Sequence, residues 1–182
     1  MRKLNPAVVL LLGGLLAACT TLQPATLRDA QLQLLPVSDA ITPVLLQQKI
    51  TWVHGDTQLA FIAVLRLTPE HLRLLALNAN GQALLDVHLE EGELNASGVL
   101  AEKLPVRDIL ATLQFAHWPV EALRSGYPAA DAWALIDADD SRELSIAGNA
   151  FLSLQRQGAL TTISNWRDNY TLMINTLKSR PL

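Results

Sequence analysis

Short apolar runs separated by turn signals dominate the chain from about residue 47 to residue 97. The longest run is Thr57–Thr68, which Pro69 ends. Turn signals containing glycine separate the runs at His54–Asp56, Asn78–Gly81 and Glu91–Gly92. These connections are too short for parallel crossovers, so the pattern predicts a meander of antiparallel strands. The predicted strands are residues 49–54, 57–68, 72–78, 82–89 and 93–97.

The apolar period changes to that of a helix after residue 104. Val106, Ile109, Leu110 and Leu113 recur at helical spacing, and Pro105 is a favourable residue at a helix start. A Trp-Pro pair interrupts this pattern, and a second short helical segment runs on until a glycine stops it. We therefore predict a two-part helical insert at residues 105–126.

The period of two returns after the insert and predicts a second group of strands. These are residues 133–137, 143–148, 150–156, 160–166 and 170–177. With about ten strands and one helical interruption, the predicted class is α+β dominated by a curved antiparallel sheet.

Two predicted strands carry apolar side chains on both faces. In residues 57–68, Leu59, Phe61, Ala63 and Leu65 share one face, but the opposite face also carries Ala60, Ile62 and Val64. A sheet with one wet face would alternate apolar and polar residues. The pattern has two explanations. Either a helix covers one face while the strands curl tightly over the other, or the curved sheet encloses an apolar cavity with the insert as its lid.

The N-terminus has the three parts of a secretory signal. Arg2 and Lys3 precede an apolar run, Ala7–Leu16, and Leu16-Ala17-Ala18 leads to Cys19, the only cysteine of the chain. The apolar run is short for a membrane span, which takes about 20 apolar residues. An ordinary cleaved signal ending near a cysteine and a short uncleaved anchor are the alternatives.

The expected signal changes the charge and the available chemistry. Removal of residues 1–18 leaves 12 basic and 17 acidic residues, a formal net charge of −5 against −3 for the whole chain. This acidic balance argues against nucleic acid as a partner. If Cys19 carries lipid, no thiol remains for a disulfide, a metal site or thiol catalysis.

No arrangement of side chains in the sequence indicates catalysis. The four histidines, at positions 54, 71, 88 and 117, lack metal-ligand spacing, and no Gly-x-Ser-x-Gly motif occurs. The acidic run around Asp137, Asp139 and Asp140 lacks the ligand spacing of a calcium loop and is interpreted as a solvated hairpin. We expect no enzymatic activity, no metal and no cofactor beyond the lipid on Cys19.

The string Leu16–Cys19 resembles the lipobox of bacterial lipoproteins. That resemblance implies cleavage after Ala18 and attachment of diacylglycerol and an acyl group, such as palmitate, to Cys19. Thr20 in place of aspartate implies sorting to the outer membrane, facing the periplasm. The resulting organisation is a cleaved signal at 1–18, a lipidated tether at 19–44, where a helical turn or two fits around residues 27–35, and a folded domain at 45–182.

The order of elements resembles LolB, the outer-membrane lipoprotein receptor, and its soluble periplasmic relative LolA. The segment W-P-V-E-A-L-R-S-G-Y-P at 118–128 is similar to a short LolB helix, and residues 163–177 are similar to its final hairpin. The sequence also resembles small uncharacterised proteobacterial lipoproteins that accompany aryl-polyene biosynthesis genes. The resemblance implies an unclosed β-barrel with helices across its mouth. The loops at 54–56 and 78–81 are short and polar, whereas LolB has an exposed leucine-tipped loop.

Two functions remain open at this point. In the first, an outer-membrane lipoprotein binds or transfers a lipid, a polyene or acyl chain, or a lipoprotein acyl group, with a periplasmic carrier or envelope protein as partner. In the second, the core is filled and the protein is a structural or adaptor lipoprotein. The expected cavity and lid residues are Phe61, Leu65, Leu74, Ile109, Leu113, Trp118, Leu123 and Trp133.

Overall fold

The structure is a computed structural model that describes residues 30–37 and 40–182. The signal, Cys19 and the first part of the tether lie outside the described residues, so lipidation stays a prediction.

One antiparallel sheet of ten strands forms the body of the protein. Its order is β5-β4-β3-β2-β1-β10-β9-β8-β7-β6, so the first and last strands pair at its centre. In this order β5 and β6 are the two edges, and the sheet is not closed. The strands are β1 (Val44–His54), β2 (Thr57–Leu67), β3 (His71–Leu77), β4 (Ala83–Glu90), β5 (Glu93–Ser97), β6 (Trp133–Asp137), β7 (Ser141–Ile146), β8 (Asn149–Gln157), β9 (Leu160–Asn165) and β10 (Tyr170–Pro181).

The hairpins of the first half form where the turn residues predict them. The strand predicted at residues 143–148 is instead β7 at Ser141–Ile146, because Ala147 and Gly148 have positive φ angles and form the turn to β8. Between β3 and β4, the Asn78 carboxamide oxygen accepts hydrogen bonds from the backbone N–H groups of Asn80 and Gln82, both at 2.9 Å. Gly81 in the same turn has a φ of 80°, a conformation that favours glycine. The predicted class, an α+β fold dominated by an unclosed antiparallel sheet with a helical insert, is therefore confirmed.

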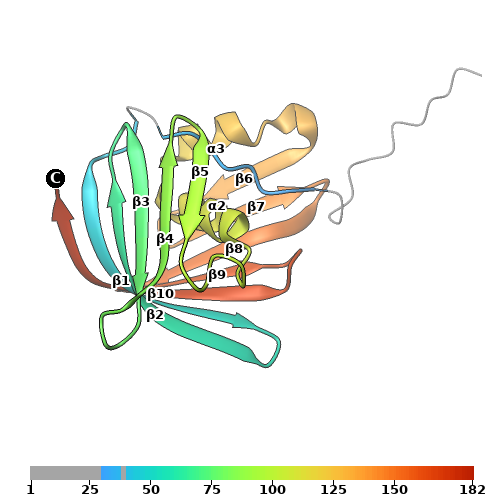
Figure 1. Ribbon diagram of the computed structural model, residues 1–182. Coiled ribbons are helices and arrows are strands. Elements are labelled where there is room, and N and C mark those ends of the chain that lie inside the picture. The colour runs from blue at the N-terminus through green and yellow to red at the C-terminus, as the bar shows by residue number, and fades with distance from the viewer. Residues whose placement is uncertain (1–29, 38–39) are drawn as a thin grey trace, which may run out of the picture.

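The insert consists of α2 (Val106–His117), α3 (Val120–Gly126) and the short 3-10 turn η1 (Ala129–Asp131). The sheet curves around α2, which lies between its two halves (Figure 1). Leu110, Leu113 and Phe115 of α2 are at most 1% exposed. Burying each such side chain contributes about 1.5–3 kcal/mol, so α2 is an integral part of the core.

The two faces of the sheet differ in burial. On β2, Phe61, Ala63 and Leu65 are buried on the concave face, whereas Ile62 and Val64 on the convex face are partly exposed. The described residues show α2 packed against the concave face, as the first explanation requires, whereas the convex face is partly exposed rather than covered. No helix among the described residues is long and apolar enough to cross a membrane.

Candidate functional site

An extended segment of residues 30–37, here called the strap, lies against the helical insert. Within the described residues it has no helical turn and is not a strand of the sheet. Ala30, Leu32 and Leu35 are buried, whereas Gln31 and Gln33 are exposed. The sequence allowed a helical turn around residues 27–35. Residues 30–35 are instead extended, because side chains of the folded domain bind their main chain.

Gln114 of α2 holds the main chain of Leu35. Its Oε1 accepts a hydrogen bond from the Leu35 N–H at 2.8 Å, and its Nε2 donates to the Leu35 carbonyl oxygen at 2.6 Å. Gln114 is 1% exposed, so both bonds are shielded from water. A buried amide normally has hydrogen-bond partners, and here the strap supplies them.

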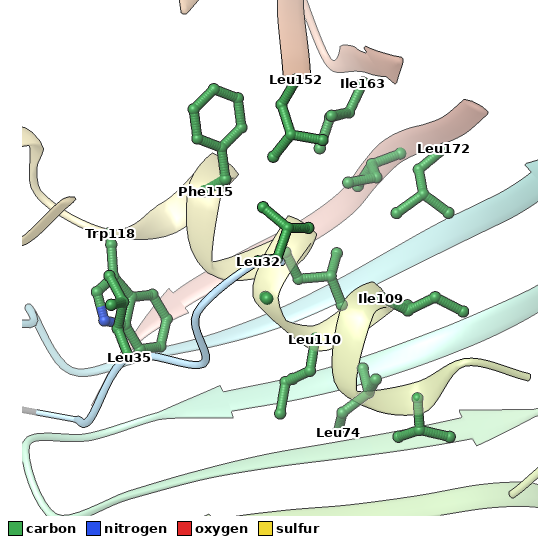
Figure 2. Close-up of a cluster of buried hydrophobic side chains, with 14 of the residues drawn as sticks. Leu32, Leu35, Leu74, Ile109, Leu110, Phe115, Trp118, Leu152, Ile163 and Leu172 are labelled. Carbon is green, nitrogen blue, oxygen red and sulfur yellow. The ribbon is translucent and has the colours of Figure 1, made fainter. Parts of the chain in front are cut away.

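Three further side chains form hydrogen bonds with main-chain groups of the strap. The Tyr127 hydroxyl accepts from the Gln33 N–H at 3.1 Å and donates to the Gln33 carbonyl oxygen at 3.0 Å. Trp118 Nε1 donates to the Pro36 carbonyl oxygen at 3.3 Å, and Arg167 donates to that of Ala30. Figure 2 shows Leu35 of the strap beside Trp118. Side chains from the insert and the β9–β10 turn thus replace the strand neighbours that an extended segment would have in a sheet.

A polar network around Arg167 anchors the start of α2 close to Ala30, the first described residue of the strap. Arg167 lies 2.7 Å from the Asp168 carboxylate and 3.6 Å from that of Asp108. Burial raises the pKa of Asp108, and the neighbouring Arg167 opposes that shift. Burial raises the pKa of Tyr170 to about 12, and its hydroxyl lies 2.8 Å from that of Thr112. Tyr170 therefore stays neutral and acts as a structural hydrogen-bonding group.

The strap and α3 border an apolar hollow of about 550 Å³, here called the strap hollow. Its walls come from residues 33–36 and 40 on one side and from Trp118 and α3 on the other. The α3 side presents Ala122 and Gly126 together with the polar Glu121 and Ser125. Another hollow of about 550 Å³ lies beside the strap and is lined in part by Arg107, Asp131 and Trp133.

A hollow of about 430 Å³, here called the arginine hollow, contains Arg142 and Arg156. Arg142 Nη1 donates to the carbonyl oxygens of Phe115 at 2.6 Å and Trp118 at 3.0 Å, which caps the C-terminus of α2. Arg142 Nε donates to Asp137 Oδ1 at 2.6 Å. Its guanidinium neutralises the end of the helix dipole and holds the pKa of Asp137 below its usual range.

All eight residues predicted for a cavity or lid belong to one buried cluster. They are Phe61, Leu65, Leu74, Ile109, Leu113, Trp118, Leu123 and Trp133. Trp118 lines both the strap hollow and the arginine hollow, and Trp133 lines the hollow beside Arg107. Ile109, Leu113 and their neighbours on α2 fill the concave side of the sheet. Whether any of the eight contacts a ligand stays a prediction.

Sequence reasoning missed the residues that position the strap, above all Gln114, Tyr127 and Arg167. Gln114 occupies a polar position within a helical pattern, and nothing in that pattern shows that it is buried. Tyr127, directly before Pro128 at the end of the insert, was the one residue whose type suggested a buried hydrogen-bonding group. Arg142 was also missed, because the acidic run next to it was interpreted as a solvated hairpin. Asp139 and Asp140 of that run are exposed, but Arg142 is buried.

The described residues contain no group of three or more histidine, cysteine, aspartate or glutamate side chains that could hold a metal ion. The hollows are bordered by aliphatic, aromatic, amide and guanidinium groups, with the carboxylates of Glu121 and Asp131 at two of them. Such groups can exclude water, hold a main chain and bind an anion.

No curated protein matches the sequence. Among solved structures, one similar chain is a proposed outer-membrane lipoprotein-sorting protein domain from Vibrio parahaemolyticus. It has 6% identity and a TM-score of 0.40, and the match covers 79% of this chain and 87% of that one. A LolA superfamily protein from Nitrosomonas europaea has 6% identity and a TM-score of 0.38, over 80% of this chain and 89% of the other. At these TM-scores, function has to be argued from the site itself. Residues 45–178 match the model of DUF3261, described as a protein of unknown function, and the chain therefore belongs to the DUF3261 family.

Proposed function

We propose that this protein is a membrane-tethered, non-catalytic binding protein that holds the apolar chain of a lipid or an acylated molecule in the strap hollow. The observation that carries the proposal is the hollow itself, which lies between two separate pieces of chain and is walled largely by apolar groups. Trp118, Ala122 and Leu35 give it a surface suited to methylene groups. Ligand pockets commonly combine such walls with a few polar groups.

Apolar burial is sufficient to bind a chain in such a hollow. Each buried methylene contributes about 0.8 kcal/mol, so ten of them offer about 8 kcal/mol before the cost of association. The volume of about 550 Å³ is within the range typical of ligand sites, roughly 300–1,000 Å³. The bound chain would lie at the surface of the insert and would leave the filled interior of the sheet intact.

The strap gives this site a movable wall. Its hydrogen bonds come from side chains of the domain, so it can separate from α3 without breaking any strand pairing. In this proposal the strap also leads back to the lipid anchor at Cys19, which keeps the site close to a membrane. Location at the periplasmic face of the outer membrane belongs to the same proposal.

An adaptor is the second candidate, and the filled concave face favours it. If the hollow holds no ligand, the surface that remains for docking includes four partly exposed aliphatic residues on the convex face. They are cross-strand neighbours on β2 and β3, with Ile62 opposite Leu77 and Val64 opposite Leu75.

Binding of a chain separates the two candidates. The test uses residues 20–182, which keep every described residue, with native mass spectrometry and a fluorescent probe carrying a sixteen-carbon chain. Ala122→Trp would fill the strap hollow, and Ala60→Trp adds the same side chain at an exposed position of β2. The binding proposal predicts that the wild type and Ala60→Trp bind the probe and that Ala122→Trp does not. The adaptor candidate predicts no binding by any of them.

A further inference from the structure

We propose that the arginine hollow binds the anionic head group of an amphiphile whose chain occupies the strap hollow. This inference rests on the proposed function and adds the chemical class of the ligand, a carboxylate or phosphate joined to an apolar chain. Trp118 borders both hollows. Its indole Nε1 donates to Pro36 of the strap and its backbone carbonyl oxygen accepts from Arg142, so one residue links the two sites.

Arg142 presents a preorganised donor to the arginine hollow. Its side chain is 7% exposed and is fixed through Nε and Nη1 by Asp137 and by the two carbonyl oxygens at the end of α2. None of these contacts uses Nη2, whose two N–H groups remain available for an oxyanion. Because the other donors hold the guanidinium plane in place, binding an anion would cost little side-chain entropy.

Arg156 supplies the charge that the hollow would otherwise lack. Asp137 offsets the charge of Arg142, whereas Arg156 makes no ion pair among the described residues. Within residues 30–37 and 40–182, its only side-chain hydrogen bond is a long one, 3.5 Å from Nη1 to the Asp139 carbonyl oxygen. The carboxylates of Asp139 and Asp140 are on the adjacent exposed turn, where solvent screens them. Among the described residues that line the hollow, Arg142 and Arg156 are the charged ones and none is a carboxylate.

His117, which also lines the arginine hollow, is affected by the charges of both arginines. Burial, followed by the charges of Arg156 and Arg142, lowers its pKa to about 4. The imidazole is neutral at pH 7, so it adds no charge of its own to the site. Both guanidinium groups act on the imidazole because all three side chains line the same hollow.

Apart from Thr42 and His117, the remaining wall of the arginine hollow is apolar. Ile41, Val44 and Leu67 line it together with Trp118 and Pro119. An apolar wall would not favour binding of a free inorganic anion, because a phosphate ion is strongly hydrated on every side and would lose water there. A ligand with an oxyanion at one end and methylene groups beside it matches both surfaces, and the adjoining strap hollow accepts the rest of its chain.

The test compares ligands that share a twelve-carbon chain and differ in their heads. Residues 20–182 are titrated by calorimetry with dodecanoate, dodecyl phosphate, dodecanol and inorganic phosphate. Arg156→Gln removes the charge and leaves the α2 cap intact, and Arg66→Gln is the control at an exposed position of β2. We expect Arg156→Gln to weaken binding of both anionic amphiphiles about tenfold. Dodecanol binding should be unchanged, and Arg66→Gln should resemble the wild type with every ligand.

Three outcomes would overturn the inference, and they differ in what they say of the proposed function. If dodecanoate, dodecyl phosphate and dodecanol bind equally well and Arg156→Gln changes none of them, the head-group site is wrong while chain binding stands. If inorganic phosphate binds as tightly as dodecyl phosphate, the hollow is a free-anion site. If no chain ligand binds to any variant, the proposed function fails together with the inference.

Discussion

The attachment of the strap through Gln114 can be tested with one substitution. Gln114→Leu keeps the approximate size of the side chain and removes both hydrogen bonds to Leu35. If the strap stayed in place, the Leu35 N–H and carbonyl groups would be buried without partners, at about 1–3 kcal/mol each. If only the part of the strap around Leu35 detached, while the Tyr127 and Arg167 contacts remained, the chain would instead lose the burial of Leu35, worth about 1.5–3 kcal/mol. Local detachment has the lower free-energy cost of the two, so we expect the strap to detach around Leu35. The free energy of unfolding should fall by about 2–3 kcal/mol.

Hydrogen exchange followed by mass spectrometry, together with urea unfolding, measures both parts of this expectation. The strap peptide should lose protection, whereas peptides from β1 and β10 at the centre of the sheet should keep theirs. Gln155→Leu is the matched control, because Gln155 is exposed on β8 and the same chemical change there buries no unpaired group. The reasoning is refuted if Gln114→Leu keeps wild-type protection in the strap and changes the free energy of unfolding no more than the control does.

Three further predictions concern the core, the contact between strap and helix, and pH. Leu110→Ala removes a fully buried side chain of α2 and should lower the free energy of unfolding by about 2–5 kcal/mol, measured in urea; a loss below about 1 kcal/mol would mean that α2 is not an integral part of the core. Gly126→Ala places a Cβ against Leu35 Cδ2, so hydrogen exchange in the strap should increase although alanine is the better helix former; a stabilised variant with an unchanged strap would contradict this contact. Because the pKa of His117 is about 4 in the folded protein and about 6.5 when unfolded, its neutral form stabilises the fold fully above pH 6.5. That contribution, at most about 3 kcal/mol, should be lost as the pH falls from 6.5 to 4, and urea midpoints for His117→Gln should decline less steeply than those of the wild type over this range.

The sequence predicts the elements well because their signals are local. Period-two runs and glycine turns mark the strands, and the change of period at Pro105 marks α2. The strand at 49–54 extends back to Val44 and the final one runs on to Pro181, since the two pair with each other along this length. That pairing joins residues more than a hundred positions apart, and no local pattern reports such a distance.

The candidate site could be predicted only in part, for a physical reason. Filling a core and lining a cavity both require apolar residues, so Leu113 or Trp118 carries the same sequence signal in either role. The strap depends on Gln114 and Tyr127, whose polar atoms are used on main-chain groups far away in sequence. Main-chain recognition of this kind leaves almost no trace in the sequence of the segment that is recognised.

Photocrosslinking with a long-chain ligand tests the central claim most directly. A fatty acid with a diazirine near the end of its chain is bound to residues 20–182 and irradiated, and the modified residues are identified by mass spectrometry. The account predicts labels on strap residues 33–36, on Trp118 and on α3, with labelling abolished by Ala122→Trp and retained by Ala60→Trp. Labels confined to the convex face at Ile62 and Leu77, or the absence of any saturable labelling, would contradict it.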